Sequence, residues 1–176
     1  MRVLLISGST RPGSSNSLAL RKLHSLHHPG VVTEMYPGLV DLPAFVPGDG
    51  PLQPPVIDLL SRLENAEAVV FSTPEYAGGL PGSLKNLLDW TVGGGQLYGK
   101  PVAWLDVANP GRGQGARTQL QTVLGYVGAR IVEAACVHVP LDASCTDITP
   151  AEETRLTATH AALVAAVQED DDATAS

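Results

Sequence analysis

The feature that most constrains the fold is a polar loop near the N-terminus, between an apolar run and a helix-like segment. Residues 3–6 are apolar, residues 7–17 read SGSTRPGSSNS, and a helical pattern begins at Leu18. A strand, a hydroxyl-rich turn and a helix start would leave backbone N–H groups without partners, and such groups carry partial positive charge. This arrangement predicts a phosphate site, to which Arg11 adds a fixed positive charge.

The spacing in this loop argues against two common phosphate sites. No Gly-Lys-Ser/Thr follows the strand, so a nucleoside triphosphate loop is not expected. Gly8 has no second glycine two places further on, which argues against a dinucleotide fingerprint. A terminal phosphomonoester such as that of FMN fits the many hydroxyl groups, although an ordinary capped turn has the same composition.

Apolar runs and helical patterns alternate along the chain of 176 residues, whose hydrophobic content of 44% suffices for one domain. Two runs, 68–72 and 101–107, are apolar almost throughout, as expected for central parallel strands that are buried on both faces. Weaker patterns predict further strands and helices at 31–36, 57–63, 116–127 and 131–138. The alternation predicts an α/β fold, a doubly wound five-stranded parallel sheet with strand order 2-1-3-4-5 and helices on both faces.

Three other segments shape the expected organisation. The proline-rich passage 37–55 is expected to be irregular and to serve as a functional or interface loop. Thr149 and Glu152 form a capping box with proline at the first helical position, which predicts a final helix. The acidic tail 169–176 has nothing to bury, so we expect a single domain over 1–168 followed by a disordered tail.

Charge and cysteine usage exclude several classes of protein. The net charge of −7 and scattered basic residues oppose binding to nucleic acid. The apolar stretch at the N-terminus is too short for a signal peptide or a membrane span, so we expect a cytoplasmic protein with no membrane partner. Cys136 and Cys145 have no nearby ligand cluster, and we expect reduced thiols and no metal site.

Two further loops have the composition of ligand-binding loops. One follows the strand at 68–72 and contains two prolines and three glycines within residues 73–83, and the other spans residues 109–115. Loops at the carboxyl ends of parallel strands meet at one edge of the sheet, so all three loops are expected to converge. Glycines there allow close approach to a flat ligand, although ordinary turns between strands and helices have similar residues.

The chain resembles a known family in these loops. The segment Gly8-Ser9-Thr10-Arg11 with Ser14 and Asn16, and the long block 73–90 (TPEYAGGLPGSLKNLLDW), are similar to the NADPH-dependent FMN reductase family, which includes quinone, azo-dye and chromate reductases. The likeness covers most of the chain, and residues 99–102 and 109–117 follow in the family's order.

The resemblance implies a flavodoxin-like fold with FMN across the crevice and NADPH or NADH as electron donor. It implies that hydride passes from the nicotinamide through flavin N5 to a small acceptor (a quinone, an azo compound, a metal oxyanion or free flavin) by a ping-pong mechanism. No catalytic acid or base is nominated, because the flavin performs the chemistry. A homodimer or a dimer of dimers is implied as well. The residues expected to bind the cofactor are Ser9, Arg11, Ser14, Asn16 and Ser17 for the phosphate, Pro74, Glu75, Tyr76, Ala77 and Gly78 for the ring edge, and Asn109, Gly111 and Arg112 for the rest of the ring.

Several points stay open at this level. Many relatives carry asparagine where this chain has Ala77, so a side-chain contact there is in doubt. A flavodoxin-type electron carrier, or a flavin-binding sensor with little turnover, would use the same fold. The sequence does not separate tightly bound FMN from a dissociable substrate, nor does it fix the nucleotide preference, for which Arg112 and Arg117 are candidates.

Overall fold

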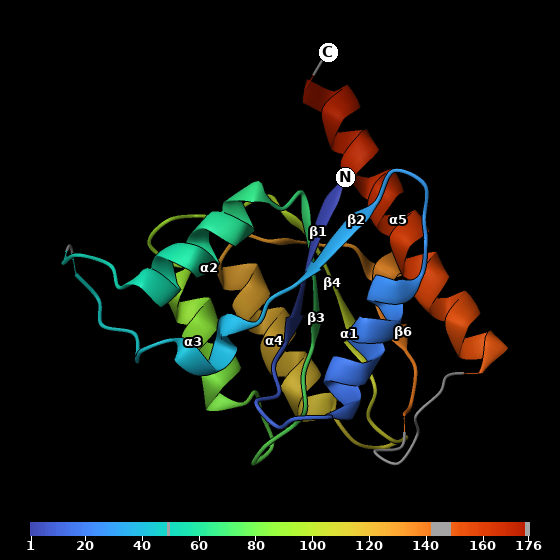
Figure 1. The fold of residues 1–176 in the computed structure, drawn as a ribbon, viewed down its shortest axis with the longest axis horizontal. Coiled ribbons are helices and arrows are strands. Elements are labelled where there is room, and N and C mark those ends of the chain that lie inside the picture. The colour runs from blue at the N-terminus through green and yellow to red at the C-terminus, as the bar shows by residue number, and fades with distance from the viewer. Residues whose placement is uncertain (49, 142–148, 175–176) are drawn as a thin grey trace.

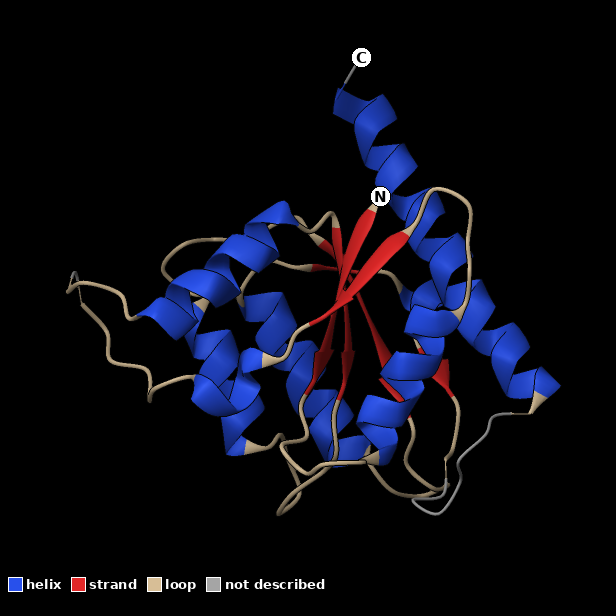
Figure 2. Cartoon of the chain, viewed as in Figure 1, coloured by secondary structure: helices blue, strands red, loops and turns tan. Residues whose placement is uncertain are grey.

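The fold is built around one parallel β-sheet with helices on both faces (Figures 1 and 2). The computed structural model describes residues 1–48, 50–141 and 149–174. The strands are β1 (Arg2–Ser7), β2 (Val32–Met35), β3 (Ala68–Ser72), β4 (Pro101–Asp106), β5 (Arg130–Ile131) and β6 (Val137–His138). The helices are α1 (Ser15–Ser25), α2 (Pro54–Asn65), α3 (Gly82–Trp90), α4 (Gln114–Tyr126) and α5 (Pro150–Thr174), with short 3-10 helices at Gly38–Asp41 and Glu133–Ala135.

The strand order is β2-β1-β3-β4-β5, and every pair in this path is parallel. This order confirms the predicted doubly wound sheet. β3 is buried at all five positions, which explains why its sequence is a continuous apolar run. Because β1 and β3 are neighbours, the loops that follow them leave the same edge of the sheet side by side.

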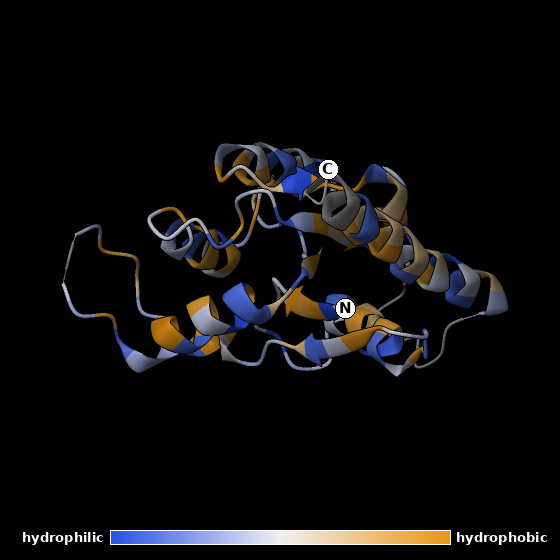
Figure 3. Cartoon of the chain, turned by 90° about the horizontal axis from the view of Figure 1, so that it is seen from above, coloured by the Kyte–Doolittle hydropathy of each residue, from blue (hydrophilic) through white to orange (hydrophobic). Residues whose placement is uncertain are grey.

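Two hydrophobic cores form where helices pack against the two faces of the sheet. One joins α2, α3 and α4 to one face of the sheet through Leu59, Leu87 and Leu120, and the other joins α1 and α5 to the opposite face through Leu20 and Leu163. A view from above shows the apolar strands between the two helical layers (Figure 3). No helix among the described residues is long and apolar enough to span a bilayer.

The prediction of one continuous strand over residues 131–138 is wrong. The structure has β5 and β6 at its ends, separated by the 3-10 helix Glu133–Ala135. The amides of Ala135 and Cys136 donate to the carbonyls of Val132 and Glu133, at 2.9 and 3.0 Å. These local bonds replace bonds to β4, and pairing with β4 resumes at β6.

The predictions for the proline-rich passage and the C-terminus hold in part. Residues 38–41, which contain no proline, form a 3-10 helix inside the passage that was expected to be irregular, and α2 begins at Pro54 within it. The capping box is confirmed, because the Glu152 carboxylate accepts from the Thr149 amide at 2.6 Å and Thr149 Oγ1 accepts from the Glu152 amide at 3.3 Å. Helix α5 extends to Thr174, past the expected boundary at residue 168, and residues 175–176 lie outside the described residues. The division of the chain at residue 168 stays a prediction.

Candidate functional site

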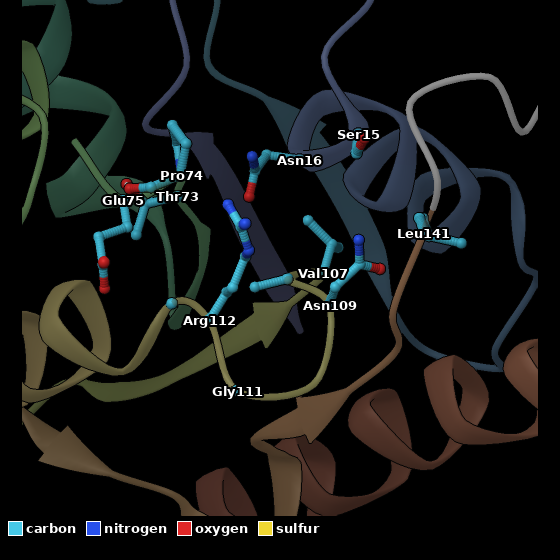
Figure 4. A pocket seen from close by; sticks show the side chains of 12 residues that line it. Ser15, Asn16, Thr73, Pro74, Glu75, Val107, Asn109, Gly111, Arg112 and Leu141 are labelled. Carbon is cyan, nitrogen blue, oxygen red and sulfur yellow. The ribbon is translucent and has the colours of Figure 1, made fainter. Parts of the chain in front are cut away.

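A pocket of about 480 Å³ lies where the loops after β1, β3 and β4 converge. Its volume falls within the roughly 300–1,000 Å³ that is usual for small-molecule and cofactor sites. Figure 4 shows side chains from all three loops around it. The lining residues are Ser15, Asn16, Thr73, Pro74, Glu75, Val107, Ala108, Asn109, Gly111, Arg112, Gly113 and Leu141.

In the first loop, the serine hydroxyls hold the start of α1. Ser14 is its N-cap, and its Oγ accepts from the Ser17 amide at 3.1 Å and donates to Ser17 Oγ at 3.0 Å. Ser17 Oγ also lies 2.9 Å from Ser7 Oγ. Both nominated hydroxyls, those of Ser14 and Ser17, therefore already have partners within the protein.

The donors that remain at the start of α1 include backbone amides. Within the described part of the chain, the amides of Ser15 and Asn16 donate to no protein acceptor, and both residues line the pocket. Ser9 and Arg11 do not line it, and Arg11 is exposed on the loop with its amide 3.3 Å from Ser9 Oγ. The first turn of α1 thus offers N–H groups, with the helix dipole behind them, to an anion in the pocket.

Asn16 joins the first loop to the end of β3. Ser72 Oγ lies 2.9 Å from Asn16 Oδ1 and 2.8 Å from the carbonyl of Leu105, and its single proton serves one acceptor at a time. Asn16 is buried, and its side chain points into the pocket (Figure 4). With Oδ1 accepting from Ser72, the side-chain NH₂ group is the part of Asn16 that is able to donate to a ligand.

The second loop forms a tight hairpin. The amides and carbonyls of Tyr76 and Gly79 pair in both directions at 3.0 Å, and the two residues between them have positive φ, +50° at Ala77 and +78° at Gly78. Ala77 is the non-glycine residue with positive φ in the described part of the chain, in a region that asparagine adopts more readily. An asparagine at this position would therefore satisfy the backbone without any ligand contact.

The tip of the hairpin also presents donors without partners. Among the described residues, no acceptor is bonded to the amides of Ala77 and Gly78, and both residues are exposed. Glu75 is different, because its Oε2 accepts from the Ala116 amide of α4 at 3.2 Å. The side chain of Glu75 therefore holds the loop against α4 through one of its two carboxylate oxygens.

The third loop is shaped by a turn and a buried carboxylate. The Arg112 amide donates to the Asn109 carbonyl at 3.0 Å, with Gly111 at φ +82°. Asp106 Oδ1 accepts from the Ala108 amide at 3.0 Å, and Asp106 Oδ2 pairs with Arg117. Arg117 is thus paired with a carboxylate of its own protein, which makes it a weaker candidate for binding a nucleotide phosphate. The Arg112 side chain instead extends into the pocket towards Asn16 (Figure 4).

Of the nominated residues, those that line this pocket are Asn16, Pro74, Glu75, Asn109, Gly111 and Arg112. Tyr76, Ala77 and Gly78 form the adjacent hairpin. The lining residues that sequence reasoning missed are Ser15, Thr73, Val107, Ala108, Gly113 and Leu141, of which all but Leu141 lie in or beside the three loops. The Leu141 amide donates to the Val107 carbonyl at 3.1 Å, and the sequence gives no signal for this contact because it depends on the register beyond β6. Roles in binding stay predictions for all of these residues.

Comparison with known proteins gives consistent matches. Residues 1–144 match the family described as NADPH-dependent FMN reductase. The quinone reductase of Escherichia coli (strain K12) is 30% identical over 142 residues, which cover 75% of this chain and 73% of the relative. An NAD(P)H-dependent FMN reductase of Pseudomonas aeruginosa is 37% identical over 123 residues, which cover 68% of this chain and 65% of the relative.

Solved structures give the same picture. The flavoenzyme NAD(P)H:(acceptor) oxidoreductase FerB from Paracoccus denitrificans superimposes with a TM-score of 0.70 at 27% identity, covering 92% of this chain and 94% of its own. A flavodoxin from the domain Archaea superimposes with a TM-score of 0.66 at 11% identity, covering 96% and 99% of the two chains. The second likeness is one of fold alone, and it confirms the flavodoxin-like architecture.

Proposed function

The chain belongs to the NADPH-dependent FMN reductase family, and on that premise we propose that it binds FMN in the three-loop pocket and uses it to oxidise NAD(P)H with a small acceptor. The membership confirms the resemblance, the oxidoreductase class, and FMN with NAD(P)H as the cofactors. The observation that carries the proposed site is the pair of amides without partners at Ser15 and Asn16, which line the pocket, with the hairpin of the second loop next to Glu75 on its rim.

The start of α1 is the proposed phosphate site. The amides of Ser15 and Asn16 would donate to the phosphate oxygens, and the side-chain NH₂ of Asn16 and the guanidinium of Arg11 would add donors. Helix-start amides and a cation suit a dianionic phosphomonoester. The hydroxyls of Ser14 and Ser17 would act indirectly, by holding this turn in shape.

The hairpin tip and the third loop are the proposed surroundings of the ring. The amides of Ala77 and Gly78 would donate to the edge of the isoalloxazine, and donors there favour negative charge on the ring. Bound FMN would supply the two-electron chemistry between nicotinamide and acceptor. The protein would position the ring and limit water access, so no side chain is required to move a proton.

We also propose which acceptor is reduced and in what order the substrates bind. We propose a quinone or free flavin as acceptor, because the relatives named above are a quinone reductase and an FMN reductase. The open crevice would hold the nicotinamide and the acceptor in turn, which gives a ping-pong mechanism. Arg112, exposed and extending into the pocket, is the proposed contact for negative charge on the nucleotide.

A homodimer in the cytoplasm is the proposed state of the protein. The proline-rich passage is fixed to α3, because Asn86 Oδ1 accepts from the Phe45 amide at 2.7 Å and Trp90 Nε1 donates to the Pro43 carbonyl at 3.0 Å. On this supported passage, the side chains of Val40 and Val46 are 65% and 70% exposed. A second subunit covering them would account for their exposure, and a monomer by light scattering over a range of concentrations would rule this out.

Steady-state kinetics test the proposed function. Initial rates of NADPH oxidation by the FMN-loaded protein are measured at several fixed concentrations of a soluble quinone, and then with NADH. Ping-pong turnover predicts parallel double-reciprocal lines. Intersecting lines would contradict alternating occupancy of the crevice, and no turnover with any acceptor would contradict the reductase function.

A further inference from the structure

The first turns of α4 hold the hairpin of the second loop at three points. The Ala116 amide donates to Glu75 Oε2, and Gly115 packs directly against the backbone of Gly78. One turn further on, Gln119 Oε1 accepts from the Leu80 amide at 2.6 Å. The hairpin is therefore seated on a helix that lies 35 or more residues away in sequence.

The contact of Gln119 is the most specific of the three. Leu80 is 8% exposed and follows directly on the hairpin, so the bond fixes the segment that joins the hairpin to α3. A Cβ atom at Gly79 would collide with Gln119 Oε1, so a side chain there would displace the Gln119 amide group. Gln119 does not line the pocket.

The same turns of α4 also hold the third loop. Arg117 pairs with Asp106, and the same carboxylate accepts from the Ala108 amide at the start of that loop. Helix α4 thus connects the two loops that are proposed to surround the ring. The first loop has its own support in Ser72 and Asn16.

We infer that Gln119 is a positioning residue for flavin recognition, which sets the place of the Ala77 and Gly78 amides through its bond to Leu80 and touches no ligand itself. The inference rests on the proposed function, because it needs the hairpin to meet the ring. It assigns Gln119 to the ring and not to the phosphate, since its bond reaches only the second loop.

Three variants test this role. Gln119→Leu removes the acceptor, Gln119→Glu keeps one, and Gln121→Leu makes the same change at an exposed position of the same helix. Dissociation constants for FMN and for riboflavin, which lacks the phosphate, are measured by flavin fluorescence well below the melting temperature. The two-electron midpoint potential is measured on the flavin-loaded proteins.

Because Gln119→Leu loses one hydrogen bond, we expect it to bind FMN and riboflavin about 2- to 10-fold more weakly, by the same factor for both flavins. We expect Gln121→Leu and Gln119→Glu to bind both flavins with the affinity of the wild type. The midpoint potential of Gln119→Leu is expected to become more negative, because misplaced amides stabilise the reduced ring less. A lower melting temperature with unchanged affinity and potential would make Gln119 merely structural and overturn the inference, as would a loss confined to FMN. A wild-type protein that binds neither flavin would instead refute the proposed function, and the inference with it.

Discussion

Alanine at two glycines of α4 is expected to act in opposite directions, although the chemical change is the same. In a helix, alanine is favoured over glycine by about 1 kcal/mol, less near the ends. At Gly125 a Cβ atom would meet nothing within 4 Å, so Gly125→Ala should stabilise the protein. At Gly115 a Cβ atom would lie 2.9 Å from the carbonyl carbon of Gly78, closer still to its oxygen, and 3.0 Å from Glu75 Oε2.

The cost at Gly115 follows from what the new methyl group meets. The obstacle is backbone, which has no rotamer to change, so the hairpin must retreat by roughly 1 Å to restore ordinary contact. Overpacking of this kind costs about 1–3 kcal/mol, which exceeds the helix gain. A shift of this size is also larger than the roughly 0.5 Å within which a binding group must be held.

Thermal unfolding and flavin titration check both expectations. In a domain of this size, a change of 1 kcal/mol in the free energy of unfolding shifts the melting temperature by about 2–4 °C. The melting temperature of Gly125→Ala should therefore be up to about 4 °C higher than that of the wild type, and the melting temperature of Gly115→Ala should be lower. Gly115→Ala should bind FMN at least about 10-fold more weakly, which corresponds to roughly 1.4 kcal/mol, and Gly125→Ala should bind normally. If Gly115→Ala matched Gly125→Ala in both measurements, the close seating of the hairpin on α4 would be refuted.

Three further predictions concern the phosphate site, the hairpin and the opposite face of the sheet. Arg11→Ala should weaken FMN binding by about 10-fold, the lower end for a charge-assisted bond because Arg11 is exposed, and leave riboflavin binding unchanged; equal losses for both flavins would remove Arg11 from the phosphate site. Ala77→Asn should raise the free energy of unfolding in urea by about 0.5–1 kcal/mol by relieving a positive φ, and no gain would show that Ala77 is unstrained. Burial, with a smaller effect of His28, lowers the pKa of His160 to about 4 from its usual 6.5, so the unfolded chain takes up this proton first as pH falls. The free energy of unfolding should therefore decrease by up to about 3 kcal/mol as the pH falls from 6.5 to about 4. His160→Leu should lose this part of the pH dependence, and His27→Leu, at an exposed position, should keep it. Equal slopes of the free energy of unfolding against pH in the two variants would contradict the assignment to His160.

The parts of the fold that were predictable are those encoded locally. The apolar runs of β3 and β4 are continuous because both faces of these strands are covered, and the capping box of α5 involves residues three positions apart. The break between β5 and β6 was missed, because it depends on bonds to β4 that local turn bonds replace at Glu133–Ala135.

The parts of the site that were not predictable depend on contacts between distant segments. Composition indicated a hydroxyl-rich phosphate loop, but it did not show that Ser14 and Ser17 pair with each other and leave the backbone amides as donors. Similarly, Glu75 lies in a loop that composition marks as functional, and its partner on α4 is 41 residues away. Such pairings depend on how α4 packs against the sheet, which periodicity does not specify.

The most direct test of the account is an anaerobic visible spectrum of the purified protein with FMN, before and after one equivalent of NADPH and then a quinone. We predict that binding perturbs the flavin spectrum, that NADPH bleaches it directly to the two-electron-reduced form, and that quinone restores the oxidised spectrum. A flavin spectrum identical to that of free FMN would contradict the three-loop site. A perturbed spectrum that neither NADPH nor NADH bleaches would contradict the reductase function and favour an electron carrier or a sensor.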